Sequence, residues 1–152
     1  MLTWQNLSTK TGNHTNLPAK FVVDASIAVK WFSEESDTKE ARLVLQSIYQ
    51  GQALPVSPSL IIYEVANALW KGKKQDSQRV VGAVREVFSS PIDFFDLDLS
   101  LAEKSIEFMV KYDLSFYDSI YAGLSAMLDI PLLTANVKHY GKVKEIKIFT
   151  LK

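Results

Sequence analysis

The sequence predicts an α/β domain in which helices cover both faces of a central, mostly parallel sheet. Short apolar runs rich in β-branched or aromatic residues alternate with segments whose apolar residues recur at helical spacing. Strands separated by helices favour parallel pairing, because each crossover returns the chain to the same end of the sheet. The 152 residues, 47% of them hydrophobic, suffice for one core and make two domains unexpected.

Five runs are expected to form the strands. They are residues 21–24, 53–56, 92–97, 132–135 and 146–151. Helices are expected over 25–32, 38–49 and 77–88, and after three capping positions at Ser57, Ser100 and Ser115. This order places a helical segment between successive strands up to the strand at 132–135.

Composition excludes several classes of protein. The chain balances 17 Lys and Arg against 17 Asp and Glu, which fits neither an acidic disordered tail nor a strongly basic nucleic-acid coat. The absence of cysteine excludes disulfide scaffolds, thiolate zinc sites and cysteine nucleophiles, and favours a reducing, cytoplasmic location. Apolar stretches are too short to cross a bilayer, so no membrane association is expected.

Residues 1–20 differ from the rest of the chain. They are rich in Thr, Asn and Ser, lack sustained periodicity and do not have the features of a secretory signal. We therefore expect a polar, flexible leader at 1–20 and one folded domain over 21–152.

Three carboxylates stand in apolar surroundings. Asp24 ends the first expected strand, Glu64 lies within an apolar helix, and Asp118 lies in the first turn of another helix. Thr134 and Asn136 end a later strand, and the carboxyl ends of parallel strands meet at one edge of a sheet. Because an unpartnered buried carboxylate is costly, the joint placement of these acids indicates one shared site.

Each residue alone also has a structural explanation. Asp24 can cap the helix that follows it, and Asp118 is the acidic member of a capping box. Glu64 can pair with a lysine or arginine, while Thr134 and Asn136 are ordinary residues of a strand and a turn. A shared site would be built from oxygen ligands, which suit Mg²⁺ or Mn²⁺ and the hydrolysis of phosphodiester bonds.

Four segments resemble, in order, the motifs of the PIN-domain ribonucleases, and within that family they are most similar to the VapC toxins of type II toxin–antitoxin systems. The segments are 22–31, 63–69, 115–122 and 132–136. The resemblance spans residues 21–151 and implies a three-layer α/β/α sandwich that cleaves RNA endonucleolytically with Mg²⁺ or Mn²⁺. It also implies a homodimer and a cognate antitoxin as protein partner.

The resemblance implies roles for individual residues. The acidic and hydroxyl positions of the family fall on Asp24, Ser26, Glu64, Asp118 and Thr134. We expect Asp24 and Asp118 to hold the principal ion, and Glu64 to orient the attacking water or complete the ligand shell. The family's fourth acidic position is occupied by Asn136, whose amide oxygen can bind a metal but brings no charge. One ion is therefore expected rather than two.

RNA binding by a domain of balanced charge requires locally concentrated positive charge. Lys138 and Lys142 follow Asn136 closely and are the expected RNA contacts. The lysines at 71, 73 and 74 are interpreted as a solvated surface.

Two other functions stay open at this stage. The first is a catalytically degenerate PIN domain that binds RNA or a protein, suggested by Asn136 and by the capping role open to Asp118. The second is a receiver-like phosphoaspartate domain, which also gathers carboxylates at strand ends around Mg²⁺. The segment Asp24-Ala25-Ser26 argues against it, because it lacks an adjacent acidic pair and a second aspartate two residues on.

Overall fold

The computed structural model describes residues 2–3 and 17–151, and the strands of this part form one parallel sheet. In spatial order they are β1 (Leu2–Thr3), β6 (Ile148–Thr150), β5 (Leu132–Leu133), β2 (Lys20–Val23), β3 (Leu54–Pro58) and β4 (Asp93–Phe95). Each pair of neighbours is parallel, so the carboxyl ends of all these strands lie at one edge. The expected class and sheet type are confirmed.

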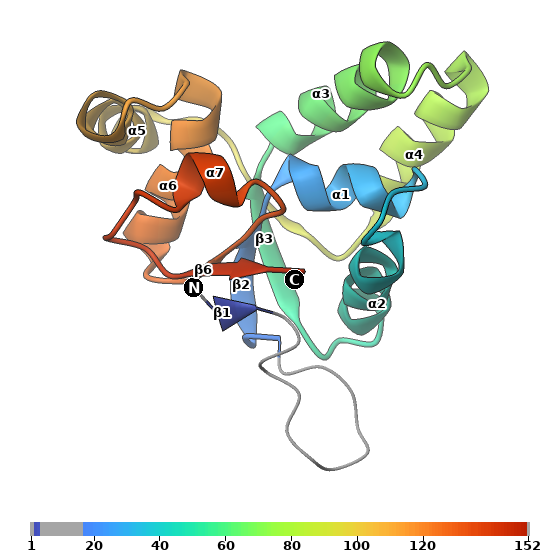
Figure 1. Ribbon diagram of the computed structural model, residues 1–152, viewed down its shortest axis with the longest axis horizontal. Helices are drawn as coiled ribbons and strands as arrows, with labels where there is room; N and C mark the ends of the chain where they lie inside the picture. Colours follow the sequence, from blue (N-terminus) through green and yellow to red (C-terminus); the bar gives the residue numbers. More distant parts are fainter. Residues whose placement is uncertain (1, 4–16, 152) are drawn as a thin grey trace.

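Helices flank this sheet on two sides. They are α1 (Ala25–Trp31), α2 (Thr38–Tyr49), α3 (Leu60–Asn67), α4 (Ser77–Ser89), α5 (Leu99–Tyr112), α6 (Phe116–Leu128) and α7 (Val137–Tyr140), with a π-helical turn η2 (Ala68–Gly72) extending α3. Figure 1 shows α5, α6 and α7 on one side of β2 and β3, and α1 to α4 on the other. This is the expected three-layer arrangement. In the part of the chain that the structure describes, no helix is long and apolar enough to cross a bilayer.

The first strand, β1, was not predicted. Leu2 pairs with Phe149 of β6, so the start of the expected leader joins the edge of the sheet. A strand of two residues carries no periodicity that could reveal it. The remainder of the leader, over 4–16, lies outside the described residues.

Two helices begin close to the expected capping residues. Ser115 caps α6 as expected, because its Oγ accepts from the backbone N of Asp118 at 3.0 Å. Ser100 does not cap α5. The carboxylate of Asp98 accepts from the backbone N of Leu101 at 2.8 Å and starts that helix one residue before Ser100.

The expected start of α3 at Ser57 is also wrong. Ser57 and Pro58 continue β3, where they pair with Phe94 and Phe95 of β4, and the helix begins at Leu60. Ser57 Oγ donates to the carbonyl of Val23 at 2.9 Å. Strand pairing therefore overrides the local capping signal.

The chain reverses its direction of travel through the sheet at β2. From β2 it moves to β3 and β4 on one side, whereas β5 and β6 lie on the other. The loops that leave β2 and β5 thus diverge in opposite directions, and ligands of open α/β sheets bind in the crevice at such a reversal. The fold itself selects the ends of β2 and β5 as the place to look for a site.

Helix α6 contacts β2, β3 and β5, and α5 packs along its outer side. The two helices approach closely at Gly123. A Cβ added there would lie 2.9 Å from the Oγ of Ser105 and 3.3 Å from its backbone N. Ser105 is fully buried and its Oγ donates to the carbonyl of Leu101, so it has little freedom to move.

We therefore expect Gly123→Ala to destabilise the fold by about 1–3 kcal/mol, because overpacking forces α5 and α6 apart. Gly82→Ala is the matched control, since Gly82 lies inside α4 with open space around it. That change should be neutral or stabilising by up to about 1 kcal/mol. Urea unfolding of both variants measures the difference, and equal free energies of unfolding would contradict the close approach.

Candidate active site

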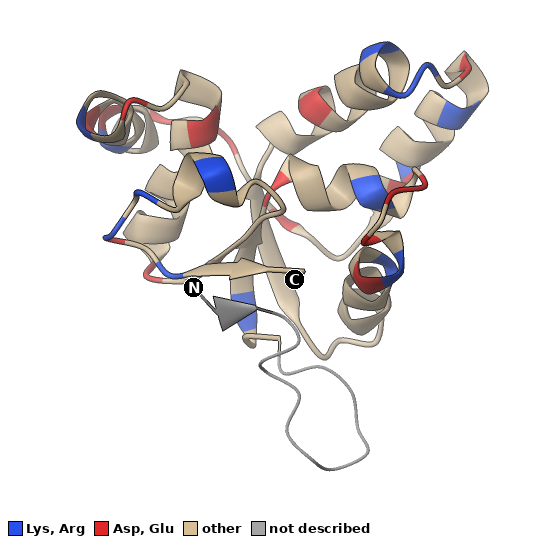
Figure 2. Cartoon of the chain, viewed as in Figure 1, with Lys and Arg blue, Asp and Glu red and all other residues tan. Residues whose placement is uncertain are grey.

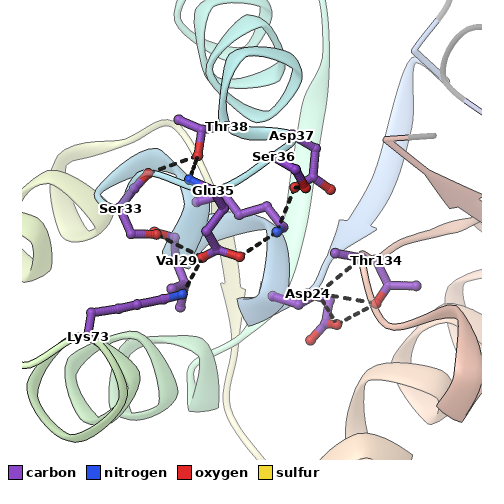
Figure 3. A network of polar contacts seen from close by, with 12 residues as sticks. Asp24, Val29, Ser33, Glu35, Ser36, Asp37, Thr38, Lys73 and Thr134 are labelled. Atoms are coloured by element: carbon purple, nitrogen blue, oxygen red, sulfur yellow. Dashed lines mark hydrogen bonds and ion pairs between the residues drawn. The ribbon is translucent and has the colours of Figure 1, made fainter.

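The pairing of β2 with β5 brings Asp24 beside Thr134. Val23 lies opposite Leu133, and the backbone N of Asp24 donates to the carbonyl of Leu133 at 3.0 Å. The side chain of Asp24 is 6% exposed, and its Oδ2 accepts from Thr134 Oγ1 at 2.6 Å. Figure 3 shows the two side chains pointing toward one another.

Ser26 completes this network from the first turn of α1. Its Oγ donates to Asp24 Oδ2 at 2.7 Å and accepts from the backbone N of Ala135 at 3.0 Å. Thr134 Oγ1 in turn accepts from the backbone N of Asn136 at 2.9 Å. The two hydroxyls therefore orient the carboxylate and also tie the loop after β5 to the start of α1.

Glu64 and Asp118 approach the same region from α3 and α6. Tyr121, also on α6, donates its hydroxyl to Glu64 Oε2 at 2.5 Å. Asp118 Oδ2 accepts from Ser115 Oγ at 2.8 Å, and Tyr140 OH lies 3.4 Å from Asp118 Oδ1. Asp118 thus exchanges hydrogen bonds with the Ser115 side chain at the start of α6, and its carboxylate also faces the site.

The charges of neighbouring acids add to the effect of burial at Asp24 and at Glu64. Burial raises the pKa of Asp24; the hydroxyls of Thr134 and Ser26 offset this in part, and the charge of Asp118 raises it further. Burial raises the pKa of Glu64 to about 7, opposed by Tyr121 and reinforced by Asp24 and Asp118. Within the described residues neither Asp24 nor Glu64 forms an ion pair with Lys or Arg. In the described part of the chain, the carboxylates of Asp24 and Glu64 are thus left without a Lys or Arg counter-group.

This donor set fits a hard divalent cation in its chemistry. Carboxylate, amide and hydroxyl oxygens gather at one sheet edge, and a cation would relieve the repulsion between the acids. No three His, Asp or Glu side chains among residues 2–3 and 17–151 are close enough together to form a ready-made ligand shell. The acids therefore lie near one another, but they do not form a complete ligand shell for a metal ion.

The loop after β5 also brings Asn136 and His139 to the site. Asn136 Nδ2 lies 2.9 Å from His139 Nδ1, which is 3.3 Å from Asp118 Oδ2. Sequence reasoning assigned His139 no role and missed the hydroxyls of Tyr121 and Tyr140. Tyr121 follows Asp118 by three residues on one helix face, a spacing that could have revealed it.

A pocket of about 480 Å³ opens beside Glu64, and the other two acids, Asp24 and Asp118, are not part of its lining. Ser26, Glu64 and Asn136 line it, as do Lys30 and Lys73, which the sequence did not place there. The expected RNA contacts at 138 and 142 are absent from its lining, and Lys142 Nζ instead donates to the carbonyl of Asp113.

Lys30 and Lys73 belong to one ion-pair network with Glu35, which Figure 3 shows on the other side of α1 from Thr134. Glu35 Oε2 lies 2.7 Å from Lys30 Nζ, and Glu35 Oε1 lies 2.8 Å from Lys73 Nζ. Lys30 also pairs with Asp37 at 2.8 Å. Burial would raise the pKa of Glu35, but the two lysines and Ser33 outweigh it and lower the pKa to about 2.

Comparison with known proteins gives a family and a fold. A family model described as PIN domain matches residues 21–144. No curated protein is similar enough in sequence to match. Several solved structures share the fold. Mycobacterium tuberculosis VapC20, described as a sarcin–ricin loop cleaving toxin, superposes with a TM-score of 0.66 at 13% identity, covering 81% of this chain and 95% of that one.

Two complexes give similar values. The DNA-bound VapBC of Salmonella typhimurium matches with a TM-score of 0.63 at 18% identity, over 88% of this chain and 98% of that one. A toxin–antitoxin complex from Klebsiella pneumoniae matches with a TM-score of 0.59 at 18% identity, over 83% and 94%. At these identities the likeness concerns the fold.

The hydroxyl of Thr134 should contribute measurably to stability. Thr134→Val removes the hydrogen bonds to Asp24 Oδ2 and from the backbone N of Asn136, in a fully buried position. We expect a loss of about 1–3 kcal/mol, because buried groups are left without partners. Thr134→Ser keeps the hydroxyl and should recover most of it. Chemical denaturation of both variants tests this; a full loss in Thr134→Ser with none in Thr134→Val would show that the methyl group matters instead.

The Glu35 network predicts an acid-dependent contribution to stability. The pKa of Glu35 is about 2 in the fold against an ordinary 4.5, so its ion pairs stabilise the protein above pH 4.5 and stop doing so as the pH falls toward 2. The stability difference between wild type and Glu35→Gln should therefore be largest at pH 7 and shrink by pH 3. Glu34→Gln is the control, since the Glu34 side chain is 80% exposed. Denaturation curves that stay equally far apart at pH 7 and pH 3 would contradict this assignment.

Proposed function

Because the chain belongs to the PIN-domain family, we propose that it is a metal-dependent endoribonuclease that hydrolyses RNA phosphodiester bonds. One observation carries the proposal: Asp24, Glu64 and Asp118 repel one another at the carboxyl edge of the sheet, without a basic partner for Asp24 or Glu64. Family membership also sets aside the receiver-like alternative.

The roles of the residues follow from their contacts. Mg²⁺ or Mn²⁺, when bound, would neutralise charge on the reacting phosphate and activate water. Asp24 and Asp118 would hold the ion, with Ser26 and Thr134 fixing the orientation of Asp24 by donating to its Oδ2.

The other contributions come from the facing helices. Glu64, held by the Tyr121 hydroxyl, would accept a hydrogen bond from the attacking water. Asn136 would offer a neutral oxygen where the family pattern has a fourth acid, so we propose a single ion. Lys138 and Lys142 would contribute positive charge for RNA near the loop that carries Asn136.

The biological setting is proposed from the similar structures. Two of them are toxin–antitoxin complexes and a third is a toxin, which supports a toxin role with a cognate antitoxin as partner. We also propose a homodimer acting in the cytoplasm, with residues 1–20 as a leader to a nuclease domain over 21–152.

The test is cleavage of mixed RNA with Mg²⁺ or Mn²⁺, against EDTA, by wild type, Asp24→Asn and Asp118→Asn. Both variants should lose cleavage and bind Mn²⁺ at least tenfold more weakly by calorimetry. Their melting temperatures should stay equal to or above that of wild type, because each change removes a repelling negative charge. Asp93→Asn, on the exposed edge strand β4, is the control that should cut normally.

Retained cleavage in both variants would reject the assignment of the ligands. A wild-type protein that binds RNA but neither cuts it nor binds Mn²⁺ would instead favour the degenerate RNA-binding alternative.

A further inference from the structure

We propose that Lys73, supported by Lys30 and held by Glu35, forms a phosphate-binding wall that seats the RNA backbone in the pocket beside the acids. This inference rests on the proposed ribonuclease function and names the part of the chain that binds its substrate.

The pocket joins two groups of residues. Its lining includes Ser26, Glu64 and Asn136 from the candidate site and Lys30, Glu35 and Lys73 from the ion-pair network, while Asp24 and Asp118 lie outside the lining. Figure 3 shows Lys73 reaching toward Glu35 on one side of α1, with Asp24 and Thr134 on the other. At about 480 Å³ the pocket lies within the range that encloses small ligands, which leaves room for a short part of an RNA backbone.

The segment that carries Lys73 is held firmly in place. The π-helical turn η2 ends at Gly72, and the backbone N of Lys73 donates to the carbonyl of Ala68 at 2.9 Å. Gln75 Nε2 donates to the carbonyl of Phe32 at 2.7 Å, which fastens the turn to the end of α1. π-Helical turns are frequent at functional sites, because they redirect side chains at a local cost in stability.

Lys73 has donors to spare. Its ammonium carries three N–H groups, of which Glu35 Oε1 takes one, and its side chain is 37% exposed. Lys30, by contrast, is 10% exposed and lies between Glu35 and Asp37. The buried Lys30 therefore neutralises charge on Glu35 and Asp37. Lys73 can direct its remaining N–H donors toward a phosphate.

Position distinguishes Lys73 from its neighbours. Figure 2 shows basic residues gathered at the end of η2 and in the turn before α4. Of Lys71, Lys73 and Lys74, Lys73 alone lines the pocket. All three lysines are exposed, as the solvated-surface interpretation expects, but Lys73 also pairs with Glu35 and lines the pocket.

The experiment measures binding of a fluorescent single-stranded RNA by anisotropy, at several salt concentrations, with Ca²⁺ in place of Mg²⁺ and with the full chain. Lys73→Gln should weaken binding about five- to tenfold and reduce the salt slope by about 0.7. Lys73→Arg should retain affinity within about twofold, as should Lys71→Gln, the matched control from the same turn. Glu35→Gln should tighten binding, because it removes the carboxylate that competes with phosphate for Lys73.

In cleavage assays with Mn²⁺, Lys73→Gln should raise KM more than it lowers kcat. Circular dichroism and melting confirm that each variant is folded. If Glu35→Gln does not fold, the comparison of Lys73→Gln with Lys71→Gln tests the inference by itself. Equal effects of Lys73→Gln and Lys71→Gln, or no RNA binding by wild type, would overturn the inference.

The two proposals can fail separately. If wild type cuts RNA and Lys73→Gln changes neither binding nor KM, the ribonuclease function stands and this inference falls. If wild type binds RNA through Lys73 but never cuts it, this inference stands and the ribonuclease function falls.

Discussion

The buried carboxylate of Asp24 at the end of β2 is the constraint around which this part of the molecule is arranged. Burial opposes its ionisation, and the nearby charge of Asp118 adds to the penalty. Among the described residues, two hydroxyl groups rather than a lysine or arginine contact this carboxylate. Donors of this kind orient a carboxylate but leave its charge uncompensated, which is the condition that favours binding of a cation.

The same hydroxyls connect the acid to the loops. Ser26 and Thr134 accept from the backbone of the segment after β5, so the geometry of Asp24 and the path of that loop depend on each other. On the other side of α1, Glu35 forms ion pairs with Lys30 and Lys73. The short helix α1 thus separates Asp24, which has no Lys or Arg partner among the described residues, from a balanced ion-pair network. A polyanion and its metal ion would need these two environments side by side.

Much of the fold could be predicted from the sequence, because periodicity and capping are local properties. All five expected runs contain a strand, and the box at Ser115 was placed correctly. Errors arose where a local capping signal competes with a neighbouring cap or with strand pairing. Asp98 outcompeted Ser100 as a cap, and pairing with β4 kept Ser57 in a strand. The strand at Leu2–Thr3 was too short to leave a pattern.

For the site, the sequence by itself determined which acids lie in apolar surroundings and which residues follow strands, because residue type and periodicity are written in the chain. It did not determine which side chain lies next to which acid. The tertiary structure decided that Glu64 meets a tyrosine hydroxyl and that Lys73 enters the pocket while Lys71 does not. Such partnerships join segments tens of residues apart, and they depend on how helices pack and where a π-helical turn redirects the chain.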